Sequence, residues 1–283
     1  MVSPYTFAEL QTWATNECAA AQLPVSRREI QVLLMAASGL DKAGLIDRAE
    51  QVSPENSTQT FKSYLRRRLQ REPVYRILGC REFHGLQLEL NEATLEPRDD
   101  TETLVEAVVA ELENRKSQMR FLDLGTGTGA IALALLSELP QATCVALDVE
   151  PKTLAAASKN AHTNGLAERF EAVCSDWFAE VTGSFDFIVS NPPYIASSEM
   201  TNLEEEVQKF DPPLALDGGE DGLDAYREIL SGARDFLQEG GFVGLEIGFD
   251  QRQSVSDLAI QLGWKSVKCL QDLAGRDRAL IVQ

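Results

Sequence analysis

The chain has 283 residues, of which 44% are hydrophobic, so it can bury a sizeable core in one large domain or two ordinary ones. Its formal net charge of -18 repels phosphate backbones and argues against non-specific binding to nucleic acid. Five scattered cysteines, never spaced C-x-x-C, and two histidines predict reduced thiols and no metal site. With neither a signal-like start nor an apolar run near the ~18 residues that span a membrane, the chain is expected to be cytoplasmic.

The first 72 residues contain no convincing strand and predict a small helical domain. Apolar residues at helical spacing favour a helix over 5–22. Ser26, followed three residues later by Glu29, predicts a capping box at the start of a second helix, and a third is expected over about 55–71. A basic cluster on this last helix favours a solvated face over a patch for RNA or a protein partner. It consists of Arg66, Arg67, Arg68 and Arg71.

Residues 73–95 change character and predict a β-hairpin that links two domains. Two short strands are expected on either side of Gly85. Their apolar residues are Tyr75, Ile77 and Leu78, then Leu86, Leu88 and Leu90. His84 and His162 are interpreted as ordinary hairpin or surface residues.

From residue 96 to 283 the pattern becomes an alternation of strands and helices. Such alternation predicts an α/β fold with a doubly wound, mostly parallel sheet. The expected strands are 121–124, 143–148, 170–174, 185–190, 242–247, 264–270 and 278–282. The expected helices are 130–139, 151–163, 223–237 and 251–262.

A glycine-rich segment joins the first of these strands to its helix and predicts a ligand site. It consists of Gly125, Thr126, Gly127, Thr128 and Gly129. The next strand ends in Asp148, whose carboxylate can accept both hydroxyls of a ribose. This spacing indicates a nucleoside site, although it also fits a dinucleotide fingerprint. A helix cap is the plain alternative for Asp148 alone.

The four residues Asn191-Pro192-Pro193-Tyr194 follow a buried strand and carry the most chemical information. The two prolines forbid helix, so the chain leaves the strand extended, with carbonyls free to point outward. This group suits a planar NH2: the Asn191 oxygen and the Pro192 carbonyl accept its hydrogens, and Tyr194 stacks on its plane. A turn in which Asn191 bonds its own backbone is the alternative.

The cofactor is indicated by what lies beyond the glycine segment. A dinucleotide enzyme has no use for an amide-and-aromatic cluster after the fourth strand, whereas an enzyme with a sulfonium methyl donor has. Asp176 and Trp177 follow the third strand and are expected beside an adenine, with Asp176 toward its amino group and Trp177 against its face. A helix cap and a core tryptophan would otherwise explain them.

Together these motifs resemble the class I S-adenosylmethionine-dependent methyltransferases. They are more closely similar to the HemK/PrmC family, which methylates the glutamine of the Gly-Gly-Gln motif in class I peptide chain release factors. The resemblance covers nearly the whole chain after residue 72. Its more specific pieces are Glu72-Pro73-Val74, Gly79-Cys80-Arg81-Glu82-Phe83, Pro97-Arg98-Asp99-Asp100-Thr101-Glu102, Leu214-Ala215-Leu216-Asp217-Gly218-Gly219-Glu220-Asp221-Gly222-Leu223, Leu245-Glu246-Ile247-Gly248 and Asp272-Leu273-Ala274-Gly275-Arg276-Asp277-Arg278.

The resemblance implies a seven-stranded Rossmann-like methyltransferase sheet and methyl transfer to a glutamine amide in translation termination. Catalysis would fall to Asn191, Pro192 and Tyr194, and the glutamine would be bound by these three with Pro193. S-adenosylmethionine would be bound, without a metal, by Gly125, Thr126, Gly127, Thr128, Gly129, Asp148, Asp176, Trp177 and Asn191. The partner would be a class I release factor, recognised through residues 1–72, with 73–95 as linker and 96–283 as the catalytic domain. Neither a membrane nor stable nucleic-acid binding is expected.

The sequence departs from the family pattern at two positions, of which the first is expected to leave function intact and the second affects a contact at the substrate mouth. Asp99 replaces a proline, and Pro213 replaces an arginine. Further candidates for the pocket wall are Arg98, Thr101 and Glu102, while Glu246 is interpreted as pairing with an arginine. The alternative functions are adenine amino-methylation of nucleic acid, nicotinamide-dependent oxidation, and release-factor binding without catalysis.

Overall fold

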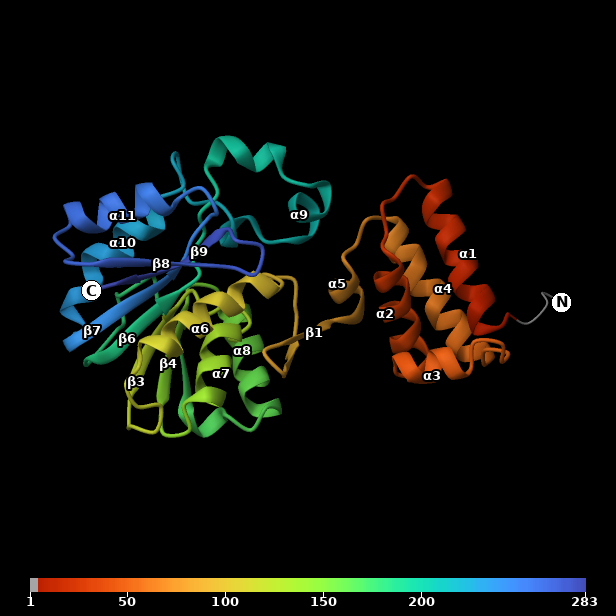
Figure 1. Cartoon of the computed structure of the whole chain (residues 1–283), viewed down its shortest axis with the longest axis horizontal. Coiled ribbons are helices and arrows are strands. Elements are labelled where there is room, and N and C mark those ends of the chain that lie inside the picture. The colour runs from red at the N-terminus through yellow and green to blue at the C-terminus, as the bar shows by residue number, and fades with distance from the viewer. Residues whose placement is uncertain (1–4) are drawn as a thin grey trace. The chain divides into compact units, whose positions relative to one another are not determined.

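The computed structural model describes residues 5–283 and divides the chain into two compact units, Met1–Gly79 and Cys80–Gln283 (Figure 1). Residues 1–4, at the start of the predicted helical domain, lie outside the described range. Within that range, every helix is too short or too polar to cross a membrane.

The first unit is helical, as the sequence predicts. Its helices are α1 Phe7–Ala20, α2 Arg27–Ser38, α3 Lys42–Asp47, α4 Glu55–Leu69 and α5 Val74–Leu78. The capping box is confirmed, because the Glu29 backbone N–H donates to Ser26 Oγ at 3.2 Å and the Ser26 N–H donates to Glu29 Oε2 at 2.7 Å. The short helix α3 escaped prediction.

The predicted strand through Tyr75, Ile77 and Leu78 is wrong, because these residues form α5. Pro73 starts this helix, and Gly79, with φ of 72° in the left-handed region, ends it. Five residues are too few for a helical period to be distinguished from alternation.

The predicted solvated face on α4 is wrong for Arg68. This arginine is 4% exposed and pairs with Glu29 of α2 at 3.2 Å. Arg67 lies nearer the surface and pairs with Glu72 at 2.5 Å. Glu29 therefore caps α2 with one carboxylate oxygen and pairs with α4 through the other. The core of this unit is formed only by residues between Tyr5 and Leu78.

The second unit begins with a hairpin of β1 Cys80–Phe83 and β2 Leu86–Glu89. His84 and Gly85 form its turn, with φ of 49° and 75°, as expected for a two-residue hairpin connection. The hairpin is confirmed, but it starts after α5. The His84 ring lies 3.1 Å from Glu138.

The main sheet has seven strands in the order β5-β4-β3-β6-β7-β9-β8, and β9 runs antiparallel to its neighbours. The strands are β3 Arg120–Leu124, β4 Thr143–Asp148, β5 Phe170–Cys174, β6 Phe185–Ser190, β7 Leu237–Glu246, β8 Val267–Gln271 and β9 Asp277–Val282. The longer helices are α6 Glu102–Glu111, α7 Ala130–Glu138, α8 Pro151–Thr163, α10 Asp224–Gly232 and α11 Arg252–Gln261, with a shorter α9 Glu205–Phe210. The predicted mostly parallel, doubly wound sheet is confirmed.

Two apolar cores lie on opposite faces of this sheet (Figure 1). Helices α6, α7 and α8 contribute to one core, and α10 and α11 contribute to the other. The predicted helix 223–237 is too long, because β7 already starts at Leu237. The predicted strand 242–247 starts too late, because Gly240 and Gly241 already lie inside β7, near a register shift against β6.

Candidate active site

The ends of the parallel strands bring the predicted site residues to one edge of the sheet. Leu124, the last residue of β3, lies opposite Leu147 of β4 and Ser190 of β6. The residues that follow these strands therefore begin next to one another, as in other open α/β sheets. The Ser190 hydroxyl donates to the Leu124 carbonyl at 2.7 Å and holds the ends of β3 and β6 together.

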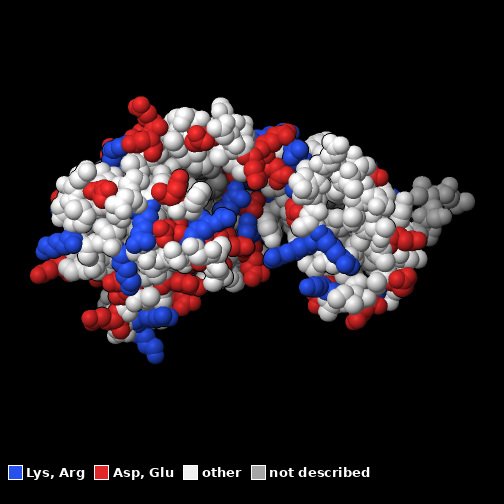
Figure 2. Space-filling view, turned by 45° about the horizontal axis from the view of Figure 1, so that its top comes forward, with Lys and Arg blue, Asp and Glu red and all other residues white. Residues whose placement is uncertain are grey.

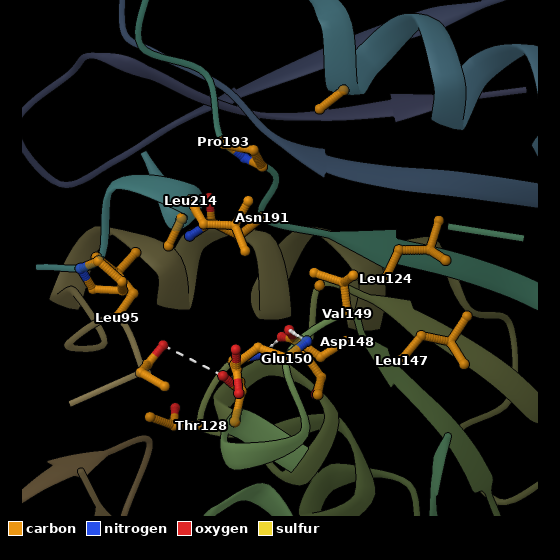
Figure 3. A pocket seen from close by; sticks show the side chains of 18 of the residues that line it. Leu95, Leu124, Thr128, Leu147, Asp148, Val149, Glu150, Asn191, Pro193 and Leu214 are labelled. Carbon is orange, nitrogen blue, oxygen red and sulfur yellow. Dashed lines mark hydrogen bonds between the residues drawn. The ribbon is translucent and has the colours of Figure 1, made fainter. Parts of the chain in front are cut away.

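A cavity of about 1090 Å³ lies at this edge and contains most of the predicted residues. The predicted residues that line it are Gly125, Thr126, Gly127, Thr128, Asp148, Asp176, Trp177, Asn191 and Pro193. Gly129, Pro192 and Tyr194 do not line it. Figure 3 shows Asp148 and Glu150 at one end of the cavity and Asn191, Pro193 and Leu214 toward the other.

The glycine segment requires its glycines. Gly125, Gly127 and Gly129 have φ of 69°, 58° and 83°, in the left-handed region that side chains disfavour. Between them, Thr126 donates its backbone N–H to the end of β4 at 2.8 Å and its hydroxyl to the buried Asp123 carboxylate at 2.7 Å. Gly129 shapes the turn into α7 without reaching the cavity. These contacts fix the conformation of the segment, which lines the cavity from Gly125 to Thr128.

Asp148 braces the same segment. Its Oδ2 accepts from the Gly127 backbone N–H at 3.1 Å, and its Oδ1 accepts from the Glu150 N–H at 3.0 Å. Burial raises the pKa of Asp148, and these two hydrogen bonds oppose the rise. Each carboxylate oxygen keeps a further lone pair, so a bound hydroxyl can still be accepted.

Trp177 is held in an uncommon backbone conformation beside the cavity. Its φ is 46°, in the left-handed region that bulky residues rarely adopt. The Ser175 hydroxyl donates to the Trp177 carbonyl at 2.9 Å and accepts from the Glu180 N–H at 3.1 Å. The ring also packs against the sheet core. Trp177 therefore both lines the cavity and packs against the core, and its contact with an adenine stays a prediction.

Asn191 follows β6 directly and lines the cavity. Among the residues that the structure describes, its side-chain amide makes no hydrogen bond. The alternative interpretation, in which the Asn191 side chain bonds its own backbone in a turn, is therefore wrong.

Tyr194 is not among the residues that line the cavity. Its ring packs against the sheet core, and its hydroxyl lies 3.5 Å from Glu246 Oε1. Its carbonyl accepts from Gln251 Nε2 at 2.9 Å. Burial, and next the Glu246 carboxyl, raise the pKa of Tyr194 to about 12. Pro192 is buried. Stacking on a substrate amide stays a prediction.

The backbone of residues 193–195 packs against Gly218, which was not among the predicted site residues. Gly218 donates to the Ile195 carbonyl at 2.8 Å. A Cβ atom at Gly218 would lie 2.8 Å from the Pro193 carbonyl oxygen and 2.9 Å from Tyr194 Cα. Only glycine allows this close approach of two backbones. The adjacent pair Gly218-Gly219 was the available sequence signal.

The mouth of the cavity combines charge with apolar surface. Arg98 pairs with the buried Asp211 at 2.9 Å, and both Arg98 and Pro213 line the cavity. Leu214 is 64% exposed beside them. Thus Arg98 supplies a cation beside Pro213, where the family pattern has arginine. Of the further candidates, Thr101 lines the cavity, whereas Glu102 accepts from the His84 N–H at 3.0 Å.

Two family models match separate parts of the chain. The PrmC N-terminal domain model matches residues 9–79, and the Methyltransferase small domain model matches residues 99–210. The release factor glutamine methyltransferase of Agrobacterium fabrum is 45% identical over 89% of this chain and 88% of its own length. That of Moorella thermoacetica is 40% identical over 95% of each. The chain belongs to the release factor glutamine methyltransferases.

Solved structures confirm the fold of this methyltransferase. The hMettl16 catalytic domain in complex with MAT2A 3'UTR hairpin 6 matches with a TM-score of 0.58 and 18% identity, over 74% of this chain and 81% of that one. A methyltransferase from Pyrococcus furiosus matches with a TM-score of 0.50 and 20% identity, over 70% and 88%. At such identities only the fold is shared.

A buried polar cluster lies behind the cavity of this methyltransferase. Glu246 ends β7 and is 1% exposed, and its Oε2 has no hydrogen-bond partner among the described residues. Arg278 pairs with Asp100 at 3.2 Å and Asp272 at 3.6 Å. The predicted Glu246–arginine ion pair is therefore absent from the described residues. Burial raises the pKa of Glu246 to about 7, and Thr101 and Arg278 oppose the rise.

Glu246→Gln should make the enzyme less sensitive to rising pH. A carboxyl whose pKa is raised on folding destabilises the native state once pH exceeds its unfolded pKa, and the full cost is reached above its folded pKa. Between about pH 5 and about pH 8, the wild type should lose ~1–3 kcal/mol of unfolding free energy relative to the variant.

Urea unfolding at both pH values would measure this loss. Asp123, whose pKa burial also raises to about 7, is present in both proteins and cancels in the comparison. A stability difference between the two proteins that does not change with pH would show that Glu246 does not titrate in this range.

Proposed function

We propose that this chain transfers a methyl group from S-adenosylmethionine to the side-chain amide nitrogen of the glutamine in the Gly-Gly-Gln motif of class I release factors. The observation that supports this most is the free amide of Asn191 in the same cavity as the glycine segment and Asp148. The amide that would hold the substrate glutamine and the segment that would hold the donor nucleoside then line one cavity, because they follow the adjacent strands β6 and β3.

The residues present fit the donor. The cavity, at about 1090 Å³, slightly exceeds the ~300–1,000 Å³ usual for small-molecule sites, which leaves room for a glutamine side chain. The glycine segment, the Asp148 carboxylate and the Trp177 ring line the cavity and offer partners for the polar and planar parts of a nucleoside. The donor supplies the electrophilic methyl and its sulfur leaving group.

The protein acts on the reaction mainly by orientation. The Asn191 side-chain oxygen and the Pro192 carbonyl accept the two amide hydrogens of the glutamine, which points its nitrogen at the methyl carbon. The C–N bond forms as the C–S bond breaks, and the proton leaves the nitrogen afterwards to water. Holding two reactants in this geometry can supply on the order of 7–11 kcal/mol.

Asp148→Ala should weaken donor binding more than acceptor binding. The variant loses a charged acceptor of hydroxyl groups and also the brace on the Gly127 N–H. Hydrogen bonds to charged groups contribute ~1.5–3 kcal/mol, so the donor Kd should rise by about 10- to 150-fold. Calorimetric titration with S-adenosylmethionine measures it. Unchanged affinity in the folded variant would remove Asp148 from the site.

Adenine amino-methylation is the rival activity, because an exocyclic NH2 could use the same four residues. Charge argues against it. The first unit carries 10 Lys and Arg against 8 Asp and Glu, so of the chain totals of 26 and 44 the second unit holds 16 and 36. Acidic side chains are spread over the face seen in Figure 2. A catalytic unit of this charge suits a protein substrate better than a polyphosphate one.

Incubation with labelled S-adenosylmethionine and two separate acceptors tests the proposal. We expect label on the intact release factor and none on adenine-containing DNA or RNA. Label on nucleic acid alone would favour the rival activity. The helical unit is proposed to select the release factor, and the proposed location is the cytoplasm, where such factors act.

A further inference from the structure

One buried amide joins the hairpin to the glycine segment. Asn160 lies on α8 and is 0% exposed. Its Oδ1 accepts from the Glu89 N–H at 2.8 Å, and its Nδ2 donates to the Glu89 carbonyl at 3.1 Å. The same Nδ2 donates its second hydrogen to the Thr128 carbonyl at 2.9 Å. Asn160 therefore uses its amide fully, on two segments far apart in sequence.

A second asparagine, one helical turn later, provides an internal comparison. Asn164 pairs with Gln87, donating to its carbonyl at 2.9 Å and accepting from its N–H at 3.3 Å. Four residues of helix rise about 6.0 Å and two residues of strand about 6.6 Å, so Asn160 and Asn164 match Glu89 and Gln87 in spacing. The two asparagines thus bond the backbone groups on the edge of β2 that does not pair with β1, as a neighbouring strand would.

Only Asn160 also reaches the glycine segment. Thr128 lies between Gly127 and Gly129, both in the left-handed region, and it lines the cavity. Two glycines leave such a peptide free to rotate unless a contact fixes it. The Thr128 carbonyl shares its planar peptide group with the Gly129 N–H, which donates to the Thr126 carbonyl at 2.8 Å. This peptide is therefore held by one bond inside the segment and by one bond from Asn160, which ties it to α8.

We propose that Asn160 is a positioning residue for the donor: it holds the Thr128–Gly129 peptide, and with it the cavity-lining course of the glycine segment, by anchoring that peptide to α8 and the hairpin. This rests on the proposed function, in which that segment binds S-adenosylmethionine. Packing alone does not require a buried amide, because an apolar side chain fills space without the cost of burying polar atoms.

Asn160→Ala and its matched control Asn164→Ala separate this role from support of the hairpin. Both variants lose one pair of bonds to β2, but only Asn160→Ala also removes the bond to the Thr128 carbonyl. We expect Asn160→Ala to raise the donor Kd about tenfold or more. Its kcat at saturating donor and its acceptor KM should stay within about threefold of wild type. Asn164→Ala should leave the donor Kd within about twofold.

Equal donor affinity in Asn160→Ala and wild type, or equal losses in both variants, would overturn the inference. A wild-type protein that fails to bind S-adenosylmethionine would contradict the proposed function instead. Side-chain amide hydrogen exchange in the wild type needs no variant and applies even if Asn160→Ala does not fold. Donor binding should slow exchange at Asn160 more than at Asn164, and equal slowing would contradict the assignment.

Discussion

Asn191→Ala should reduce the rate of methyl transfer by about 10²–10³-fold, the usual cost of removing one positioned polar group from an active site. Its side chain follows β6, lines the cavity and has no hydrogen bond to another described residue. Donor affinity should stay close to wild type, because the proposed donor contacts of the glycine segment, Asp148 and Trp177 follow β3, β4 and β5. The loss should therefore fall on kcat rather than on donor binding.

Single-turnover kinetics with saturating S-adenosylmethionine measures the chemical step directly. Asn202→Ala is a suitable control, because Asn202 is an exposed asparagine on the same connection, bonded to Glu199. The control should retain the wild-type rate. If Asn191→Ala also turned over near that rate, orientation of the glutamine by two acceptors would be wrong.

Removal of the helical unit should cost about 100-fold in kcat/KM on an intact release factor. A protein interface of ordinary size contributes several kcal/mol, and we assign recognition to residues before Cys80. The truncated chain should begin at Cys80, because β1 and β2 belong to the second unit, where β2 pairs with Asn160 and Asn164. The cores of the two units share no residue, which favours independent folding.

A short Gly-Gly-Gln peptide serves as the reference substrate for this truncation. The full and shortened chains should methylate it within about threefold of one another, provided that circular dichroism shows the shortened chain to be folded. Equal kcat/KM of the two chains on the intact factor would mean that recognition lies on the catalytic unit.

Much of the catalytic unit could be predicted because each signal is local. The strand before Gly125, the acid at Asp148 and the proline pair after β6 each combine a periodic apolar run with residues that break it. Parallel pairing then brings their ends to one edge of the sheet, and this follows from topology alone.

What escaped prediction depends on contacts between distant segments. Arg98 and Asp211 are 113 positions apart in the sequence, and the residues around each do not indicate that the two form an ion pair. Arg68 looked solvated because its helix face is basic, yet it is buried against Glu29. The ring of Tyr194 turns toward Glu246, 52 positions away, rather than lining the cavity.

The most direct test of the central claim is peptide mapping of a class I release factor after incubation with this protein and S-adenosylmethionine. We predict one added methyl group, located on the side-chain amide of the glutamine in Gly-Gly-Gln, and its loss when that glutamine is replaced. Methylation of any other residue with that glutamine unmodified, or no methylation of a factor by folded protein that binds the donor, would contradict the account.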